Sequence, residues 1–165
     1  MRALAGMALA VLLTAAVPAA AEPWALERSQ VERVASSNGA TYRLLIAWPE
    51  GAPPANGWPV LWLLDGEQHF ATAALTARRL AEAGARTGIE PGLIVGVDSG
   101  ALAPRVHDYT PATPGYAIPP GMPAHGLRTG GAEAFLDVVE QELQPLVAGR
   151  WAIDPARQTL AGHSL

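Results

Sequence analysis

The sequence predicts an α/β domain with a largely parallel sheet, and two observations carry this prediction. Residues 59–64 and 93–97 are continuous apolar runs without alternation, which is typical of strands covered by helices on both faces. Apolar residues at helical spacing follow each run, over residues 70–84 and 131–147. With an opening hairpin and a short last strand, the expected order is β-β-β-α-β-α-β in a single domain without an internal repeat.

The opening hairpin is predicted from two strands over residues 31–34 and 42–48. Residues 36–39 between them read Ser-Ser-Asn-Gly, and Asn-Gly adopts positive φ at little cost, as a tight hairpin requires. Pro49 ends the second strand. Residues 53–57, which hold two prolines and a glycine, form a surface loop before the first apolar run.

The first helix is amphipathic, and its apolar face consists of Phe70, Ala74, Ala77 and Ala81. Gly84 is expected to end this helix, because glycine adopts the left-handed conformation that follows many helix C-termini.

The second half of the chain is less regular. Residues 99–130 are rich in Pro and Gly without periodicity, which predicts a long loop, and a loop of about 30 residues is usually functional or disordered. Pro145 should kink or shorten the last turn of the helix over residues 131–147. Residues 154–155, Asp-Pro, are expected to form a turn, and residues 158–161 a short strand.

Composition excludes several classes of protein. Half of the 165 residues are hydrophobic and 16% are charged, which argues against intrinsic disorder. The chain has a net charge of −4, no lysine and scattered arginines, so we expect no nucleic-acid partner. The absence of cysteine excludes disulfides and thiolate chemistry.

The N-terminus resembles a signal peptide. Arg2 precedes an apolar stretch over residues 3–17, and residues 19–21 are alanines of the kind that signal peptidase accepts before Glu22. The stretch is shorter than the roughly 20 residues of a membrane-spanning helix, so an uncleaved anchor is the less favoured alternative. Removal of residues 1–21 leaves residues 22–165 as the mature part, in the bacterial periplasm or secreted, where a protein without disulfides is permitted.

The last four residues carry the chemical signal. Gly162-His163-Ser164-Leu165 supplies four of the five positions of Gly-x-Ser-x-Gly, the strained strand-to-helix turn that exposes a nucleophilic serine. Taken alone, this short match is also compatible with an ordinary turn serine. The loop after the first apolar run favours the interpretation of Ser164 as a nucleophile. In such sites one oxyanion N–H group comes from that loop and the other from the residue after the serine. Glu67 and Leu165 occupy these two positions.

The motifs together resemble the putative-esterase family of α/β-hydrolases, and most of all its exported enterochelin and salmochelin esterases. They occur in the family's order over residues 60–66, 94–97, 105–111, 130–136 and 162–165. The resemblance implies a three-layer α/β-hydrolase fold with a mostly parallel sheet. It makes Ser164 the nucleophile and places Arg105 near an anionic catecholate substrate. An alternative for Arg105 is a structural ion pair with Asp108.

The expected activity is hydrolysis of a siderophore ester. It proceeds through an acyl-enzyme on Ser164 and needs no cofactor. A general carboxylesterase, an acyltransferase and a non-catalytic ligand-binding relative are the alternatives. A metal site of Asp65, Glu67 and His69 is less favoured than a solvated loop, because these residues fall at a loop-to-helix junction.

One departure from the family concerns the general base. In α/β-hydrolases the acid and the histidine follow the serine in sequence, and no residue follows Leu165 here. The four histidines are therefore expected to be surface or core residues: His69, His107, His125 and His163. Because serine is a poor nucleophile without a base, we expect a domain truncated after the elbow strand and a 165-residue chain without appreciable esterase activity.

Overall fold

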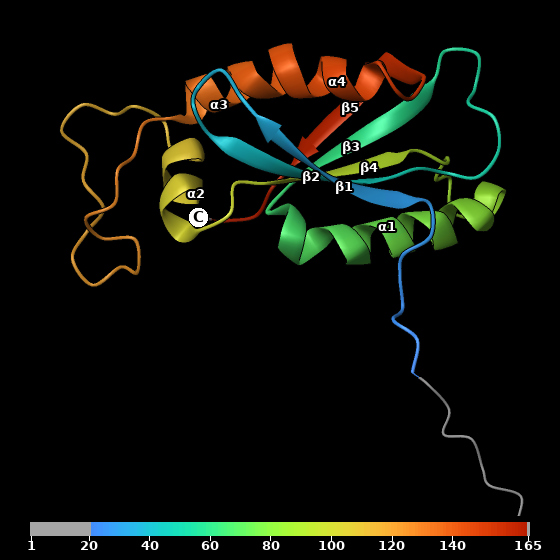
Figure 1. Ribbon diagram of the computed structural model, residues 1–165, viewed down its shortest axis with the longest axis horizontal. Coiled ribbons are helices and arrows are strands. Elements are labelled where there is room, and N and C mark those ends of the chain that lie inside the picture. The colour runs from blue at the N-terminus through green and yellow to red at the C-terminus, as the bar shows by residue number, and fades with distance from the viewer. Residues whose placement is uncertain (1–20, 165) are drawn as a thin grey trace, which may run out of the picture.

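The computed structural model describes residues 21–164, so all but the last residue of the predicted signal peptide, as well as Leu165, lie outside the described residues. A five-stranded mixed sheet lies between helices on its two faces (Figure 1). Its strands are β1 (Ser29–Ala35), β2 (Thr41–Ala47), β3 (Trp58–Leu64), β4 (Leu93–Asp98) and β5 (Ile153–Ala161). The spatial order is β1-β2-β4-β3-β5, with β4, β3 and β5 parallel and the opening hairpin antiparallel, as predicted.

The hairpin turn works through its glycine. Gly39 has φ +82°, and its N–H donates to the carbonyl oxygen of Ser36 at 3.0 Å. Glu142 then anchors the turn to the helical layer, since its carboxylate accepts hydrogen bonds from the Ser37 N–H at 3.1 and 3.2 Å.

The larger part of the core lies between the sheet and one continuous helical segment. This segment consists of α3 (Ala132–Val138), a π-helical turn η2 (Val139–Leu143) and α4 (Gln144–Ala148). Its inward side chains pack against every second residue of the central strands. The apolar runs do not alternate in sequence, but their successive side chains point to opposite faces of the sheet, and both faces are covered by helices. The fully buried side chains of this layer include Trp62, Tyr42, Leu44, Val95, Val97, Phe135, Leu143 and Val147.

The opposite face is covered by α1 (Gly66–Glu82), which begins earlier than the predicted helix. Phe70 and Ala74 are buried against the sheet, and Ala77 is half-buried beside them. Gly84 follows the helix with φ +47°, which confirms the predicted left-handed end. A 3₁₀ turn, η1 (Gly84–Arg86), leads on toward β4.

The predicted long loop contains a helix, so that prediction was wrong in part. Residues 102–108 form α2 (Leu102–Asp108), and the Thr110 hydroxyl donates to the Val106 carbonyl oxygen at 2.6 Å just beyond it. Pro104 is tolerated because it lies in the first turn, where its missing N–H would have no helical acceptor. The sequence shows no helical periodicity here because Val106 is the only buried apolar residue of α2.

The Asp-Pro pair at residues 154–155 lies inside β5 rather than in a separate turn. Pairing between β3 and β5 passes from Trp58↔Ile153 to Val60↔Gln158, so the intervening residues of β5 bulge from the ladder. Pro155 is tolerated because it lies in this bulge, where no ladder hydrogen bond is lost. The helix over residues 131–147 likewise continues past Pro145, and the π-helical turn stands immediately before it.

Candidate active site

Three of the predicted site residues, Glu67, Arg105 and Ser164, lie at the carboxyl end of the parallel strands, and Leu165 lies outside the described residues. Asp65 directly follows β3, and Gly162 directly follows β5. Because β3 and β5 are parallel neighbours with Leu63 opposite Ala161, the two turns emerge side by side at one edge of the sheet (Figure 1). In open α/β sheets this edge is where ligands bind.

Ser164 has the backbone strain expected of a nucleophile elbow. Its φ is +57° and its side chain is exposed. The left-handed conformation costs a non-glycine residue about 1 kcal/mol or more, so it persists only where the surrounding structure holds it. Gly162 allows the close approach before the turn, because a Cβ there would lie 3.0 Å from Leu64 Cδ1.

The turn between β3 and α1 is strained in the same way. Asp65, the residue before the helix, has φ 53° and ψ 48°, and its carbonyl oxygen accepts the N–H groups of Gln68 and His69 at 3.0 and 3.2 Å. Gly66 packs against β4 so closely that a Cβ would lie 2.7 Å from the carbonyl carbon of Gly96. Glu67 is the second residue of α1, and amides of the first turn have no acceptor within the helix.

Arg105 connects the two turns. Its Nε and Nη2 donate to Asp65 Oδ1 and Oδ2 at 2.6 and 2.7 Å, and Nη2 also donates to the Ser164 carbonyl oxygen at 3.4 Å. The hydrogen bonds to Asp65 raise the pKa of Arg105 further above its ordinary value. The paired side chains of Arg105 and Asp65 are only 15% and 7% exposed, so the pair is shielded from water.

The interpretation of Arg105 as a partner of Asp108 was wrong, because Asp108 serves another network. The buried Asp108 accepts the Tyr42 hydroxyl at 3.1 Å and lies 3.4 Å from His107 Nδ1. Burial is the main reason why the pKa of Tyr42 rises to about 12, and the neighbouring Asp108 adds to it.

Tyr109 belongs to the same cluster and was missed from the sequence. Its hydroxyl accepts the Asp65 N–H at 3.1 Å, and its ring lies 5.2 Å from the Arg105 guanidinium carbon. Burial raises the pKa of this phenol. The signal was the spacing: Arg105 and Tyr109 are four residues apart, which puts them on one face of a helix, but a loop was predicted there.

The residues weighed as metal ligands have other partners. Asp65 pairs with Arg105, whereas Glu67 pairs with Arg43 at 3.1 Å, which also reaches the buried Asp98 at 3.3 Å. His69 is exposed on α1. Across residues 21–164, no three His, Asp or Glu side chains gather in a metal-binding arrangement.

The four histidines are dispersed. His69, His125 and His163 are exposed, and the His107 ring packs so tightly on Gly131 that any Cβ there would clash with it. His125 Nδ1 lies 2.7 Å from the carbonyl oxygen of Ile118. Within the part of the chain that the structure describes, none forms a hydrogen bond with the Ser164 side chain.

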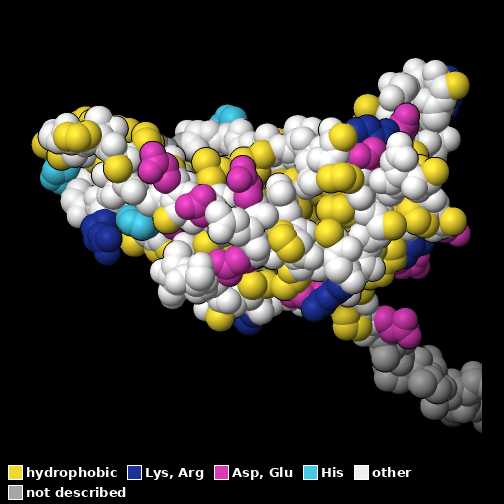
Figure 2. Space-filling model, turned by 90° about the horizontal axis from the view of Figure 1, so that it is seen from above, with side chains coloured by type: hydrophobic (Ala, Val, Ile, Leu, Met, Phe, Trp, Pro, Cys, Tyr) yellow, Lys and Arg dark blue, Asp and Glu magenta, His cyan; other side chains and the backbone are white. Residues whose placement is uncertain are grey.

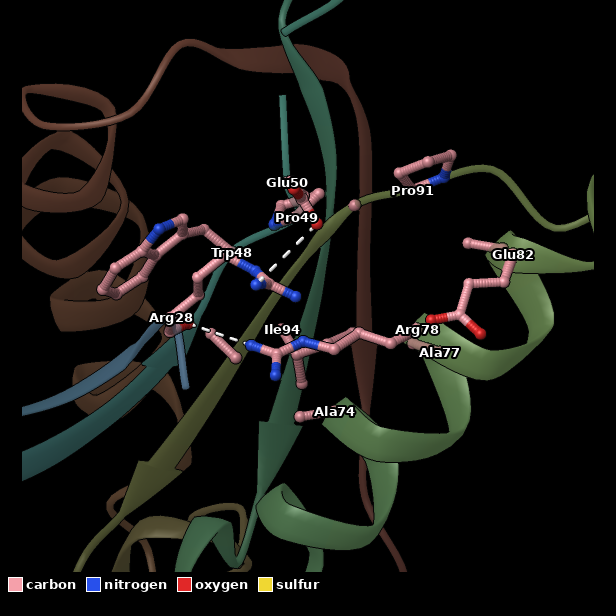
Figure 3. A pocket seen from close by; sticks show the side chains of 13 residues that line it. Arg28, Trp48, Pro49, Glu50, Ala74, Ala77, Arg78, Glu82, Pro91 and Ile94 are labelled. Atoms are coloured by element: carbon pink, nitrogen blue, oxygen red, sulfur yellow. Dashed lines mark hydrogen bonds and ion pairs between the residues drawn. The ribbon is translucent and has the colours of Figure 1, made fainter. Parts of the chain in front are cut away.

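A cavity of about 190 Å³ lies at the opposite end of the sheet, between β2, the start of β4 and the second half of α1 (Figure 3). Ala47, Ala77 and Ile94 line it together with Arg28 and Arg78. None of the residues placed at the predicted site lines this cavity.

The helical face seen from above carries scattered acidic and apolar side chains, with basic ones toward its margins (Figure 2). Glu133, Asp137 and Glu140 are exposed along α3 and η2. In the described residues, no helix has the length and apolar character needed to cross a membrane.

The fold and this edge of the sheet define a class of protein. A mixed sheet between helical layers, with a strained serine turn after the parallel strand β5 and a helix N-terminus beside it, is the arrangement of an α/β-hydrolase.

The chain belongs to the putative-esterase family, whose sequence profile matches residues 35–165. It is 33% identical over 147 residues to the ferri-bacillibactin esterase of Bacillus subtilis, covering 83% of this chain and 50% of that protein. It is 31% identical over 153 residues to the siderophore triacetylfusarinine C esterase of Aspergillus fumigatus, covering 86% and 49%. The crystal structure of a BES protein from Bacillus cereus superposes with a TM-score of 0.78 at 28% identity, over 88% of this chain and 57% of that one.

These similarities confirm the family and the fold predicted from the motifs. The chain spans about half the length of the curated relatives it matches. Carboxylic ester hydrolysis is the chemistry of this family.

Proposed function

We propose that this protein hydrolyses siderophore esters and that Ser164 is its nucleophile. The observation that carries the proposal is the left-handed Ser164, with φ +57°, beside the first turn of α1 at the carboxyl end of the sheet. The names of two relatives, a ferri-bacillibactin esterase and a siderophore esterase, support the substrate class.

In the proposed reaction, Ser164 Oγ attacks the ester carbonyl carbon while a general base takes the hydroxyl proton. The tetrahedral oxyanion accepts hydrogen bonds from the backbone N–H groups of Glu67 and Leu165. The alcohol leaves with a proton, and water hydrolyses the acyl-enzyme to the acid and free Ser164. Because no described histidine contacts Ser164 Oγ, we propose that residues 1–165 alone hydrolyse esters poorly.

Arg105 is proposed to face an anionic substrate with the one nitrogen that Asp65 leaves available. Nε and Nη2 bind Asp65, whereas Nη1 forms no hydrogen bond among the described residues. A guanidinium N–H suits a phenolate oxygen, which a deprotonated catechol siderophore offers. Signal-directed export to the periplasm or medium, with residues 22–165 in the mature protein, fits a substrate that is found outside the cytoplasm.

The test compares esters with the protein expressed from its natural gene. We expect hydrolysis of a tri-catechol lactone siderophore with a higher kcat/KM than of p-nitrophenyl butyrate, and loss of at least about 1000-fold in kcat in Ser164→Ala. A preference for p-nitrophenyl butyrate would instead favour a general carboxylesterase. Undiminished hydrolysis by Ser164→Ala would overturn the assignment of the nucleophile.

A further inference from the structure

Asp65 holds an unfavourable backbone conformation and is fixed from three directions. Its carboxylate receives two hydrogen bonds from Arg105, and its N–H donates to the Tyr109 hydroxyl. Below it, Gly66 is pressed against Gly96 of β4. The left-handed conformation is uncommon outside glycine, although aspartate adopts it more readily than most residues, and these contacts hold Asp65 in it.

The same arginine reaches the other turn of the site. Arg105 Nη2 bonds both the Asp65 carboxylate and the Ser164 carbonyl oxygen, so one planar group sets the spacing between the two turns. The ring of Tyr109 supports the guanidinium from one side at 5.2 Å. The guanidinium group of Arg105 is therefore held along its edge by hydrogen bonds and on one face by the Tyr109 ring, so its N–H donors have fixed directions.

We infer that the Asp65–Arg105 pair is a positioning device, which holds the β3–α1 turn so that the Glu67 amide and Ser164 address the same substrate carbonyl. The inference rests on the proposed function of Ser164. Arg105 thus has two roles. It contacts an anionic ligand, as proposed above, and it positions the turn whatever the charge of the substrate. Asp65 and Tyr109 act only through the turn and touch no substrate.

The physical reason is that oxyanion stabilisation depends on geometry. Backbone donors contribute only when they lie at hydrogen-bonding distance from the position of the oxyanion. A displacement of about 1 Å in such a site lowers the rate about 100-fold. A lysine at residue 105 keeps the positive charge but loses the two parallel hydrogen bonds of a guanidinium.

The experiment uses the protein expressed from its natural gene and measures kcat and KM of Arg105→Lys, Asp65→Asn and the double variant on a neutral ester and on an anionic catechol ester. We expect each single variant to lower kcat about 100-fold on both esters, with the KM for the neutral ester changed less than about threefold. The double variant should be no worse than the singles, because both remove one interaction. Arg157→Lys is the matched control: Arg157 binds Asp154 at 2.9 Å near the start of β5, and its activity should be unchanged.

Two results would overturn the inference. One is an Arg105→Lys enzyme with normal kcat on both esters. The other is a defect confined to KM for the anionic ester, which would make Arg105 a substrate-binding residue only.

A second readout needs no activity, so it separates this inference from the proposed function. The amides of Gln68 and His69 bond to the Asp65 carbonyl oxygen, and they are protected only while the turn is held. In NMR hydrogen exchange, Arg105→Lys should accelerate exchange at these two amides at least about tenfold relative to wild type and to Arg157→Lys. Unchanged protection in a folded Arg105→Lys protein would contradict the positioning role. A protein that hydrolyses no ester but shows the accelerated exchange would refute the proposed function alone.

Discussion

The two ends of the sheet both use arginine, but they use it differently. At the carboxyl end, Arg105 is 15% exposed and binds Asp65 through two hydrogen bonds, at 2.6 and 2.7 Å. At the amino end, Arg28 is 33% exposed and lies 3.7 and 3.9 Å from Glu27 and Glu50, which are 84% and 85% exposed. The first arrangement fixes the backbone of a turn, whereas the second leaves its carboxylates in water.

Arg78, at the cavity of the amino end, also differs from Arg105, because its hydrogen bonds go to backbone carbonyl oxygens and not to a carboxylate. Arg78 donates to the carbonyl oxygens of Glu27 and Arg28 at 2.6 and 3.1 Å, and Figure 3 shows the bond to Arg28. No carboxylate of the described residues forms a salt bridge with Arg78. Burial lowers the pKa of Arg78 from its ordinary value, and the positive charge of the neighbouring Arg28 lowers it further. The cavity therefore does not coincide with the proposed site. The proposed site is instead marked by strained backbone at Ser164 and Asp65 and by the buried Arg105–Asp65 pair.

The largest predicted loss of stability comes from adding one methyl group at the carboxyl end. In Gly66→Ala, the new Cβ would meet the Gly96 backbone at 2.7 Å, where no flexible side chain can yield. We expect a loss of about 3 kcal/mol in the free energy of unfolding, measured by urea titration. The control is Gly149→Ala, because Gly149 has φ −69° and its nearest contact is an ordinary 3.4 Å. Equal stability of the two variants would show that the close packing at Gly66 is not needed.

A smaller effect should follow pH at the buried phenol near α2. The pKa of Tyr42 is about 12 in the folded protein and 10.0 in an unperturbed side chain. The folded state thus retains this proton longer than the unfolded state does. The resulting stabilisation is complete below pH 10 and is lost as the pH rises toward 12, by about 2 kcal/mol.

Urea unfolding of wild type and Tyr42→Phe between pH 9 and 12 measures this difference. The decline should be shallower in Tyr42→Phe, with a remainder from Tyr109, whose pKa is also raised. Parallel declines in the two proteins would contradict the assignment to Tyr42.

The smallest effect is expected at the amino end. Arg28→Ala should change the free energy of unfolding by less than about 1 kcal/mol, since exposed ion pairs of this length contribute little. Hydrolysis of either ester should be unchanged. A loss of activity in this variant would break the distinction between the two ends, because it would place a functional residue beside the cavity.

The sequence predicted what depends on local pattern. The apolar runs around Trp62 and Val95 became the central strands, and the small residues around Gly84 ended α1 as expected. The family follows from motifs that combine a strand with a specific turn. Such signals are local because each turn needs particular residues at consecutive positions.

Contacts between distant segments were not predictable in the same way. Nothing local in the sequence indicates that Arg105 would form an ion pair with Asp65, 40 residues away, and not with Asp108 in its own helix. That choice depends on sheet order, which brings the end of β3 next to α2. The helix α2 itself was missed because a seven-residue helix with one buried apolar side chain has no detectable periodicity.

Covalent trapping of Ser164 tests the central claim most directly. The protein expressed from its natural gene would be incubated with a fluorophosphonate, which phosphonylates an activated serine with release of fluoride, and the modified residue would be located by peptide mass spectrometry. The account predicts one adduct per chain, on Ser164, with loss of ester hydrolysis in proportion to labelling. Loss of hydrolysis with the adduct on another residue, and Ser164 unmodified, would contradict it.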